Sequence, residues 1–156
     1  MVEGGLILPD EGEADLHRPM IWLPENFWYD MREAELRERV NRMDVAGRAR
    51  DLVWGPYVAL PAGRWRVTSR LFFDRWACRH RFRFEFGSSK DAVHHEFTPG
   101  REGLYELSLE HAWANPLKAE VRVIMVESSL GGVFEFEGAV VEFGGDAAPS
   151  ARADPS

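Results

Sequence analysis

The chain has 156 residues, of which 45% are hydrophobic and 12% aromatic, and this composition is typical of one globular domain large enough to bury a core. Its formal net charge of −7 argues against general nucleic-acid binding, which favours a basic surface. Cys78 is the only cysteine, so no disulfide bond can form within the chain.

The N-terminal segment carries no targeting signal that the sequence reveals. Residues 1–20 lack the basic start and the apolar run of a signal peptide, and no stretch approaches the length needed to span a membrane. The sequence therefore predicts a cytoplasmic protein by default, and association with a surface or a particle stays open. Because the first 16 residues are acidic and contain no Lys or Arg, residues 1–20 are expected to form a flexible arm.

Residues 21–29 concentrate aromatic side chains around Pro24. An exposed cluster of this kind is unusual, so the segment is expected either to pack on the rest of the domain or to meet a partner. The candidate partner-binding residues are Trp22, Phe27, Trp28 and Tyr29.

The sequence predicts one helix, over residues 30–46. Asp30 is a plausible N-cap, Glu33 completes a capping-box pattern, and Gly47 is expected to end the helix. Apolar residues recur with helical spacing at Leu36, Val40 and Met43. Residues 21–50 are therefore interpreted as an aromatic segment followed by an amphipathic helix.

From residue 51 onward the hydrophobic period changes to two, which is typical of strands with one buried face. Gly, Pro, Ser and Asp residues separate the alternating segments. The predicted strands cover 52–60, 64–73, 79–86, 92–97, 104–113, 119–127 and 133–143. Short strands at this spacing predict an all-β fold, an antiparallel β-sandwich over residues 51–143, followed by a disordered tail at 144–156.

Residues 55–67 have the sequence Gly-Pro-Tyr-Val-Ala-Leu-Pro-Ala-Gly-Arg-Trp-Arg-Val, in which Pro61 and Gly63 favour a reversal of the chain. The segment resembles the G-P-Y-x-x-L-P-x-G-x-Y-x-V opening of jelly-roll domains similar to carbohydrate-binding modules, which occur beside bacterial glycosyltransferases. Trp65 stands where Tyr is usual. The resemblance covers about residues 51–143 and implies a jelly-roll sandwich that binds polysaccharide, sometimes with a structural calcium. The first 50 residues have no counterpart in those domains.

Three tryptophans are candidates for sugar binding, because an indole ring can stack on the apolar C–H face of a sugar. Trp76 and Trp113 lie at predicted strand ends, where binding loops are found, and Trp54 lies on a predicted strand just before the Gly-Pro-Tyr motif. The alternative is that these rings cap the core.

Charged residues on three predicted strands form a second candidate surface. The planar guanidinium of Arg suits carboxylate and hydroxyl groups, so an acidic polysaccharide would fit this surface. The alternative is a solvated ladder of cross-strand ion pairs, and the two can coexist. The strands carry Arg64, Arg66 and Arg70, then Arg79, Arg81 and Arg83, then Glu106 and Glu110; the candidate sugar contacts among them are Arg66, Arg81, Arg83, Glu106 and Glu110.

The sequence favours neither a metal site nor a catalytic site. His94 and His95 are consecutive on a predicted strand, so their side chains point to opposite faces and cannot converge on one ion. The spacing typical of cupins and the G-x-S-x-G elbow are both absent. We therefore expect a protein that is not an enzyme and needs no cofactor.

Three functions are consistent with these features. The first is a non-catalytic β-sandwich that binds a polysaccharide. The second is a structural or adaptor subunit, such as a spike of a phage-like particle, that forms a homo-oligomer or meets a partner through residues 21–50. The third is a cupin-like metal enzyme. Nucleic acid and membrane are not expected partners.

Overall fold

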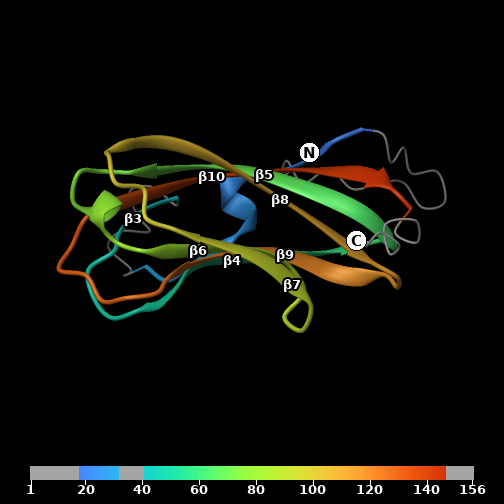
Figure 1. Cartoon of the computed structure of the whole chain (residues 1–156), viewed down its shortest axis with the longest axis horizontal. Helices are drawn as coiled ribbons and strands as arrows, with labels where there is room; N and C mark the ends of the chain where they lie inside the picture. Colours follow the sequence, from blue (N-terminus) through green and yellow to red (C-terminus); the bar gives the residue numbers. More distant parts are fainter. Residues whose placement is uncertain (1–17, 32–40, 147–156) are drawn as a thin grey trace, which may run out of the picture.

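Figure 1 shows the computed structural model, in which residues 18–31 and 41–146 are described. The described chain forms two antiparallel sheets that pack face to face as a β-sandwich (Figure 1). In sheet A the strand order is β1-β10-β5-β8, and β3 also pairs with β10. In sheet B the order is β2-β4-β9-β6-β7.

The strands of sheet A are β1 (Met20–Trp22), β3 (Arg42–Asp44), β5 (Gly63–Phe73), β8 (Gly103–Trp113) and β10 (Val133–Gly145). The strands of sheet B are β2 (Trp28–Tyr29), β4 (Arg50–Leu60), β6 (Phe82–Gly87), β7 (Ala92–Phe97) and β9 (Leu117–Met125). Short 3₁₀ turns, η2 (Pro24–Asn26) and η3 (Ala77–Arg79), connect β1 to β2 and β5 to β6. Among the residues described, no helix is long and apolar enough to cross a membrane.

The prediction of an antiparallel sandwich is confirmed, because each predicted strand coincides with one of β4 to β10. Apolar residues at alternate positions face the space between the sheets and form one core. Fully buried aromatic rings from both sheets meet there: Phe73 of β5 lies 4.7 Å from Phe82 of β6, measured between ring centroids. This contact between the sheets joins them into one domain.

The turn at residues 61–62 carries the chain from sheet B to sheet A, because β4 pairs with β9 and β5 pairs with β10 and β8. The carbonyl oxygen of Pro61 accepts hydrogen bonds from the indole N–H of Trp65 (3.0 Å) and of Trp113 (2.8 Å). The two indoles are stacked, with an interplanar angle of 7°. Gly63 is required here, since a Cβ on it would lie 2.4 Å from the Phe143 ring.

The predicted helix over residues 30–46 is not borne out. Asp30 is extended chain whose N–H donates to the carbonyl of Leu52, and Arg42–Asp44 is the strand β3. Met43 is buried opposite Phe134 of β10. Strand pairing and core burial outweigh the side-chain pairs that favour a helix, each worth a few tenths of a kcal/mol. The middle of the predicted helix, residues 32–40, lies outside the described residues.

The aromatic segment 21–29 packs mainly on the sandwich. β1 extends sheet A and β2 extends sheet B. Trp22 and Phe27 are buried, and the ring of Phe27 lies 4.7 Å from that of Phe136. These two residues are therefore core residues and do not present a surface to a partner.

Replacing Trp113 by Ala should lower the free energy of unfolding by about 3–5 kcal/mol, because the change removes a buried ring and leaves a cavity at the junction of the sheets. Trp76→Ala is the matched control, since the Trp76 side chain is 50% exposed; it should cost less than about 1 kcal/mol. Urea denaturation measures both values. Equal losses in the two variants would contradict the structural role of Trp113.

Candidate functional site

Five residues form one row across the outer face of sheet B. The strand registers place Trp28 opposite Trp54, Trp54 opposite Arg122, Arg122 opposite Glu85, and Glu85 opposite His94. Directly opposed residues project to the same side of a sheet. The pairing of β2, β4, β9, β6 and β7 thus sets two tryptophans beside a line of charged groups.

A hollow of about 400 Å³ lies at the aromatic end of this row. We call it the sheet B hollow. Strand β4 contributes most of its lining, β9 contributes one residue and the chain after β2 another. The lining residues are Asp30, Arg50, Asp51, Trp54, Tyr57 and Arg122.

The aromatic rings beside the sheet B hollow are unusually exposed. Trp28 is 52% exposed and Tyr57 41% exposed, and their ring centroids are 5.7 Å apart. A Cβ on Gly55 would lie 2.8 Å from the Trp28 ring, so only glycine lets this ring lie over β4. Exposed aromatic rings that gather in this way are typical of a binding surface.

A β-bulge sets the position of Tyr57. The register between β4 and β9 shifts between Pro56 and Val58, so Tyr57 is left without a partner on β9. Its φ of 67° lies in the left-handed region, which is uncommon for a bulky residue. Bulges redirect side chains next to functional sites, and this one aims Tyr57 at the hollow.

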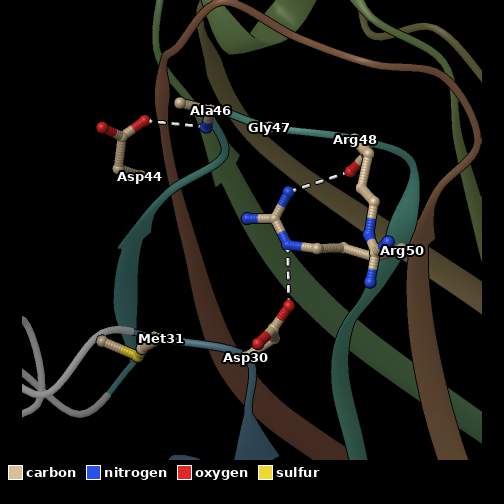
Figure 2. A pocket seen from close by; sticks show the side chains of 7 residues that line it. All are labelled: Asp30, Met31, Asp44, Ala46, Gly47, Arg48 and Arg50. Carbon is tan, nitrogen blue, oxygen red and sulfur yellow. Dashed lines mark hydrogen bonds and ion pairs between the residues drawn. The ribbon is translucent and has the colours of Figure 1, made fainter.

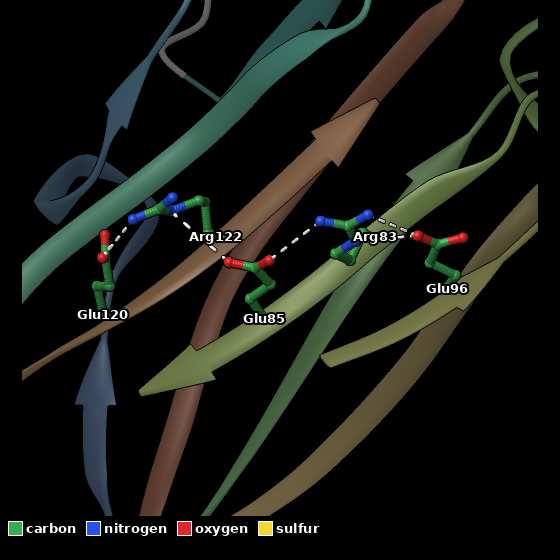
Figure 3. Close-up of polar contacts among 5 residues, drawn as sticks. All are labelled: Arg83, Glu85, Glu96, Glu120 and Arg122. Atoms are coloured by element: carbon green, nitrogen blue, oxygen red, sulfur yellow. Dashed lines mark hydrogen bonds and ion pairs between the residues drawn. The ribbon is translucent and has the colours of Figure 1, made fainter. Parts of the chain in front are cut away.

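A ladder of ion pairs continues from the hollow across β9, β6 and β7 (Figure 3). Glu120 contacts Arg122 at 2.7 Å, and Arg122 contacts Glu85 at 3.9 Å. Glu85 contacts Arg83 at 3.6 Å, and Arg83 contacts Glu96 at 2.7 Å. The alternation of carboxylate and guanidinium holds Arg122, Glu85 and Arg83 each between two partners, while Glu120 and Glu96 form the two ends.

The ladder alters the ionisation of its members. The hydrogen bond from Arg83 lowers the pKa of the Glu96 carboxyl, and the same bond raises the pKa of Arg83. Burial alone would lower the pKa of Arg122, but the hydrogen bond to Glu120 and the neighbouring carboxylates outweigh it, so the pKa of Arg122 is raised. Both guanidinium groups therefore stay charged and paired.

Glu120 is the buried end of the ladder, with a side chain only 4% exposed. Its Oε2 accepts a hydrogen bond from Arg122, whereas its Oε1 has no hydrogen-bond partner among the described residues. Burial, then the adjacent Glu120 carboxylate, raises the pKa of Tyr57, so the two groups are neighbours even though no well-formed hydrogen bond reaches Oε1. Arg122 is thus the group that compensates the charge of the buried Glu120 carboxylate.

A second hollow of about 400 Å³ adjoins the first at the β3–β4 connection (Figure 2). The two share Asp30 and Arg50, whose carboxylate and Nε are 2.8 Å apart. Arg50 also donates from Nη1 to the carbonyl of Arg48. No aromatic ring is among the lining residues, which are Asp30, Met31, Asp44, Ala46, Gly47, Arg48 and Arg50.

The structure brings together only some of the predicted sugar contacts. Trp54 and Arg83 both lie on the outer face of sheet B, and Trp28, predicted as a partner contact, lies there too. Trp113 is 4% exposed and belongs to the core, so it is not available to a ligand. Trp76 is exposed in the β5–η3 connection, where the guanidinium groups of Arg75 and Arg79 lie 4.9 and 5.4 Å from its ring centroid.

The predicted charged surface is divided between two faces. Arg66 and its neighbours lie on β5 in sheet A, whereas Arg83 lies on β6 in sheet B, because the chain changes sheets after β5. Arg66 is opposite Glu110, and Arg70 is opposite Glu106, on the outer face of sheet A. Arg81 lies near the end of the sandwich and contacts Glu127 at 3.7 Å. These residues cannot contribute to one binding surface.

Other predicted groups are held locally. The Tyr29 hydroxyl donates to the Pro24 carbonyl at 2.7 Å, and burial raises the pKa of this phenol. His95 stacks on Phe97, while His94 lies opposite Glu85. Within residues 18–31 and 41–146, no three His, Cys, Asp or Glu side chains are placed to hold a metal ion.

Sequence reasoning missed Tyr57, Arg122, Glu85 and Glu120. One signal was present: Tyr57 lies inside the segment of the family resemblance, at an outward position between apolar residues. The pairing of β9 with both β4 and β6, which brings Arg122 to the hollow with Glu120 paired to it, leaves no mark in the local sequence.

No protein-family model and no curated protein matches this chain. A solved structure described as "Family 16 Carbohydrate Binding Module-2" is similar to it, with a TM-score of 0.43 and 9% sequence identity over 64% of this chain and 73% of that chain. At this level of likeness the comparison carries no argument about the site, and the sandwich rests on the strands described above.

Glu96→Gln should make the fold less sensitive to acid. Because the hydrogen bond from Arg83 lowers the folded pKa of Glu96 from the ordinary value of 4.5, the pair stabilises the protein fully above that ordinary value. This stabilisation is lost as the pH falls toward and through the lower folded pKa. The variant should therefore lose less stability than the parent between about pH 6 and about pH 3, as measured by urea denaturation.

Glu106→Gln is the control for this measurement, since Glu106 is exposed and has no ion pair in the part of the chain that the structure describes. It should leave the acid dependence of stability nearly unchanged. If both variants change that dependence equally, the ladder does not hold Glu96 as described.

Proposed function

We propose that this protein is a non-catalytic β-sandwich that binds carbohydrate through the sheet B hollow. One observation carries the proposal: the exposed rings of Trp28 and Tyr57, together with Trp54, border a hollow lined by charged hydrogen-bonding groups. Ligand sites of this kind combine flat apolar surface with a few fixed polar groups.

The chemistry of a sugar fits this combination. The C–H face of a pyranose ring is apolar and flat enough to pack on an indole or a phenol ring, which gains stabilisation from area burial and contact. The hydroxyl groups at the ring edge need donors and acceptors, and Arg50, Asp51 and Arg122 supply both. Arg50 and Arg122 are already held by ion pairs, so binding costs little additional side-chain entropy.

The layout of the face supports a chain of sugars as the ligand. The row from Trp28 to His94 crosses all five strands of sheet B. A surface of this extent offers contacts to several consecutive sugar units. Each site would bind weakly, and repeated units on one polysaccharide would raise the avidity of several copies.

The carboxylates of this face support binding rather than hydrolysis. A glycosidase needs a general acid whose pKa is raised. On this face the hydrogen bond from Arg83 lowers the pKa of the Glu96 carboxyl, which is the opposite direction. The proposal therefore contains no chemical step.

Trp54→Ala and Tyr57→Ala should each weaken polysaccharide binding by about tenfold or more, because each removes a stacking ring. Native gel electrophoresis with embedded polysaccharides, followed by calorimetry on a ligand that retards the protein, measures the change. Trp76→Ala changes an exposed tryptophan in the β5–η3 connection that does not line the hollow, and it should leave binding unchanged.

The two other outcomes have distinct meanings. Loss of binding in Trp76→Ala with full binding in Trp54→Ala would move the site to the end of the sandwich. Absence of binding across a broad panel of polysaccharides by the parent protein would overturn the proposed function.

A further inference from the structure

We propose that the sheet B hollow selects neutral sugars and rejects uronates and other acidic sugars. This inference rests on the proposed function and names the class of ligand. It departs from the acidic polysaccharide that the arginine-rich strands favour at the level of sequence. The reason is that the hollow contains guanidinium groups but none whose charge is free.

Both arginines of the hollow already have carboxylate partners. Arg50 contacts Asp30 at 2.8 Å through Nε, and Arg122 contacts Glu120 at 2.7 Å through Nη2. Arg83, the next arginine on this face, is 2.7 Å from Glu96. Strong recognition of a carboxylate needs a cation whose charge is not already matched.

Arg122 is unable to leave its partner for a ligand carboxylate. The Glu120 side chain is 4% exposed, and its Oε1 has no hydrogen-bond partner among the residues described. If Arg122 turned toward a ligand, Glu120 would be a buried carboxylate without any compensating charge. Such a group is strongly destabilising, so the ion pair between Arg122 and Glu120 remains intact when a ligand binds.

Asp51 adds a negative charge close enough to Arg122 to help raise the pKa of that guanidinium, but it forms no ion pair of its own among the described residues. It lines the hollow opposite Ile124 of β9, and no ion pair reaches it within residues 18–31 and 41–146. The cations of the hollow, Arg50 and Arg122, are each opposed by a carboxylate of their own. A ligand carboxylate placed here would meet Asp51 as a like charge.

A hydroxyl group meets no such obstacle. A carboxylate accepts hydrogen bonds from hydroxyl groups, and a guanidinium carries five N–H donors, of which the pairs above use only some. Asp51 can accept from one sugar hydroxyl while a remaining N–H of Arg122 or Arg50 donates to another. Neutral sugars can thus hydrogen-bond to the lining residues without breaking an ion pair.

The test compares two sets of ligands with the full chain. Neutral polysaccharides (β-glucan, xylan, galactomannan) and polyuronates (polygalacturonate, alginate) are measured by affinity gel and calorimetry at about 50 and about 500 mM NaCl. At least one neutral ligand should bind, with affinity changing less than about twofold between these salt concentrations. Polyuronates should bind at least about tenfold more weakly, which corresponds to about 1.4 kcal/mol.

Asp51→Asn tests the residue directly, since it keeps the shape and removes the charge. It should weaken neutral binding by about fivefold to tenfold, because a charged acceptor is lost. It should also reduce the ratio between the affinities for neutral and for acidic polysaccharides, because the like charge that repels a ligand carboxylate is removed. Glu110→Gln, on the outer face of sheet A, is the matched control. It should change neither the affinity for neutral polysaccharides nor the ratio of neutral to acidic affinity.

The outcomes separate this inference from the proposed function. Tighter binding of polyuronates than of neutral ligands, or an unchanged ratio in Asp51→Asn, would overturn the inference and leave carbohydrate binding in place. Binding of no polysaccharide of either set would overturn both.

Discussion

The constraint on which the rest of this structure depends is the carbonyl of Pro61, held by the indole N–H groups of Trp65 and Trp113. This oxygen sits at the turn where the chain leaves sheet B and enters sheet A. The two stacked indoles also pack against both sheets, since Trp113 contacts Phe86 of sheet B and Trp65 contacts Phe143 of sheet A. The corner fixes where β4 ends, and β4 supplies most of the sheet B hollow.

The outer face of sheet B gathers features that do little for stability by themselves. Trp28 and Tyr57 are exposed, Tyr57 has a positive φ, and Glu120 is a buried carboxylate whose Oε1 meets no hydrogen-bond donor in the described part of the chain. Each of these is unfavourable for folding or neutral at best. Departures of this kind concentrate at functional sites, because a site is built for its ligand rather than for the free protein. The turn at Pro61 and the shared aromatic core provide the stability that offsets these unfavourable features.

The fold was largely predictable, and the helix shows where prediction failed. The strands β4 to β10 were found because alternation is a local property that any half-buried strand must show. The segment 30–46 carries a capping box and apolar residues at helical spacing, yet Met43 lies in a strand because β10 offers it a partner and the core offers it burial. Local preference is worth tenths of a kcal/mol per pair, while burying a large side chain contributes about 1.5–3 kcal/mol.

By itself the sequence determined the all-β architecture and the short reversal at Pro61–Gly63, because both follow from residues next to each other in the chain. It also identified Trp54 and Arg83 as candidate contacts, but it could not tell that Trp113 is buried or that Arg66 and Arg83 lie on opposite faces of the molecule. Only the tertiary structure decided which strands neighbour one another. That choice aligns Trp28, Trp54 and Arg122 and pairs Arg122 with the buried Glu120. The physical reason is that strand pairing within a sheet joins residues far apart in the chain, so ligand contacts depend on registers that no local pattern records.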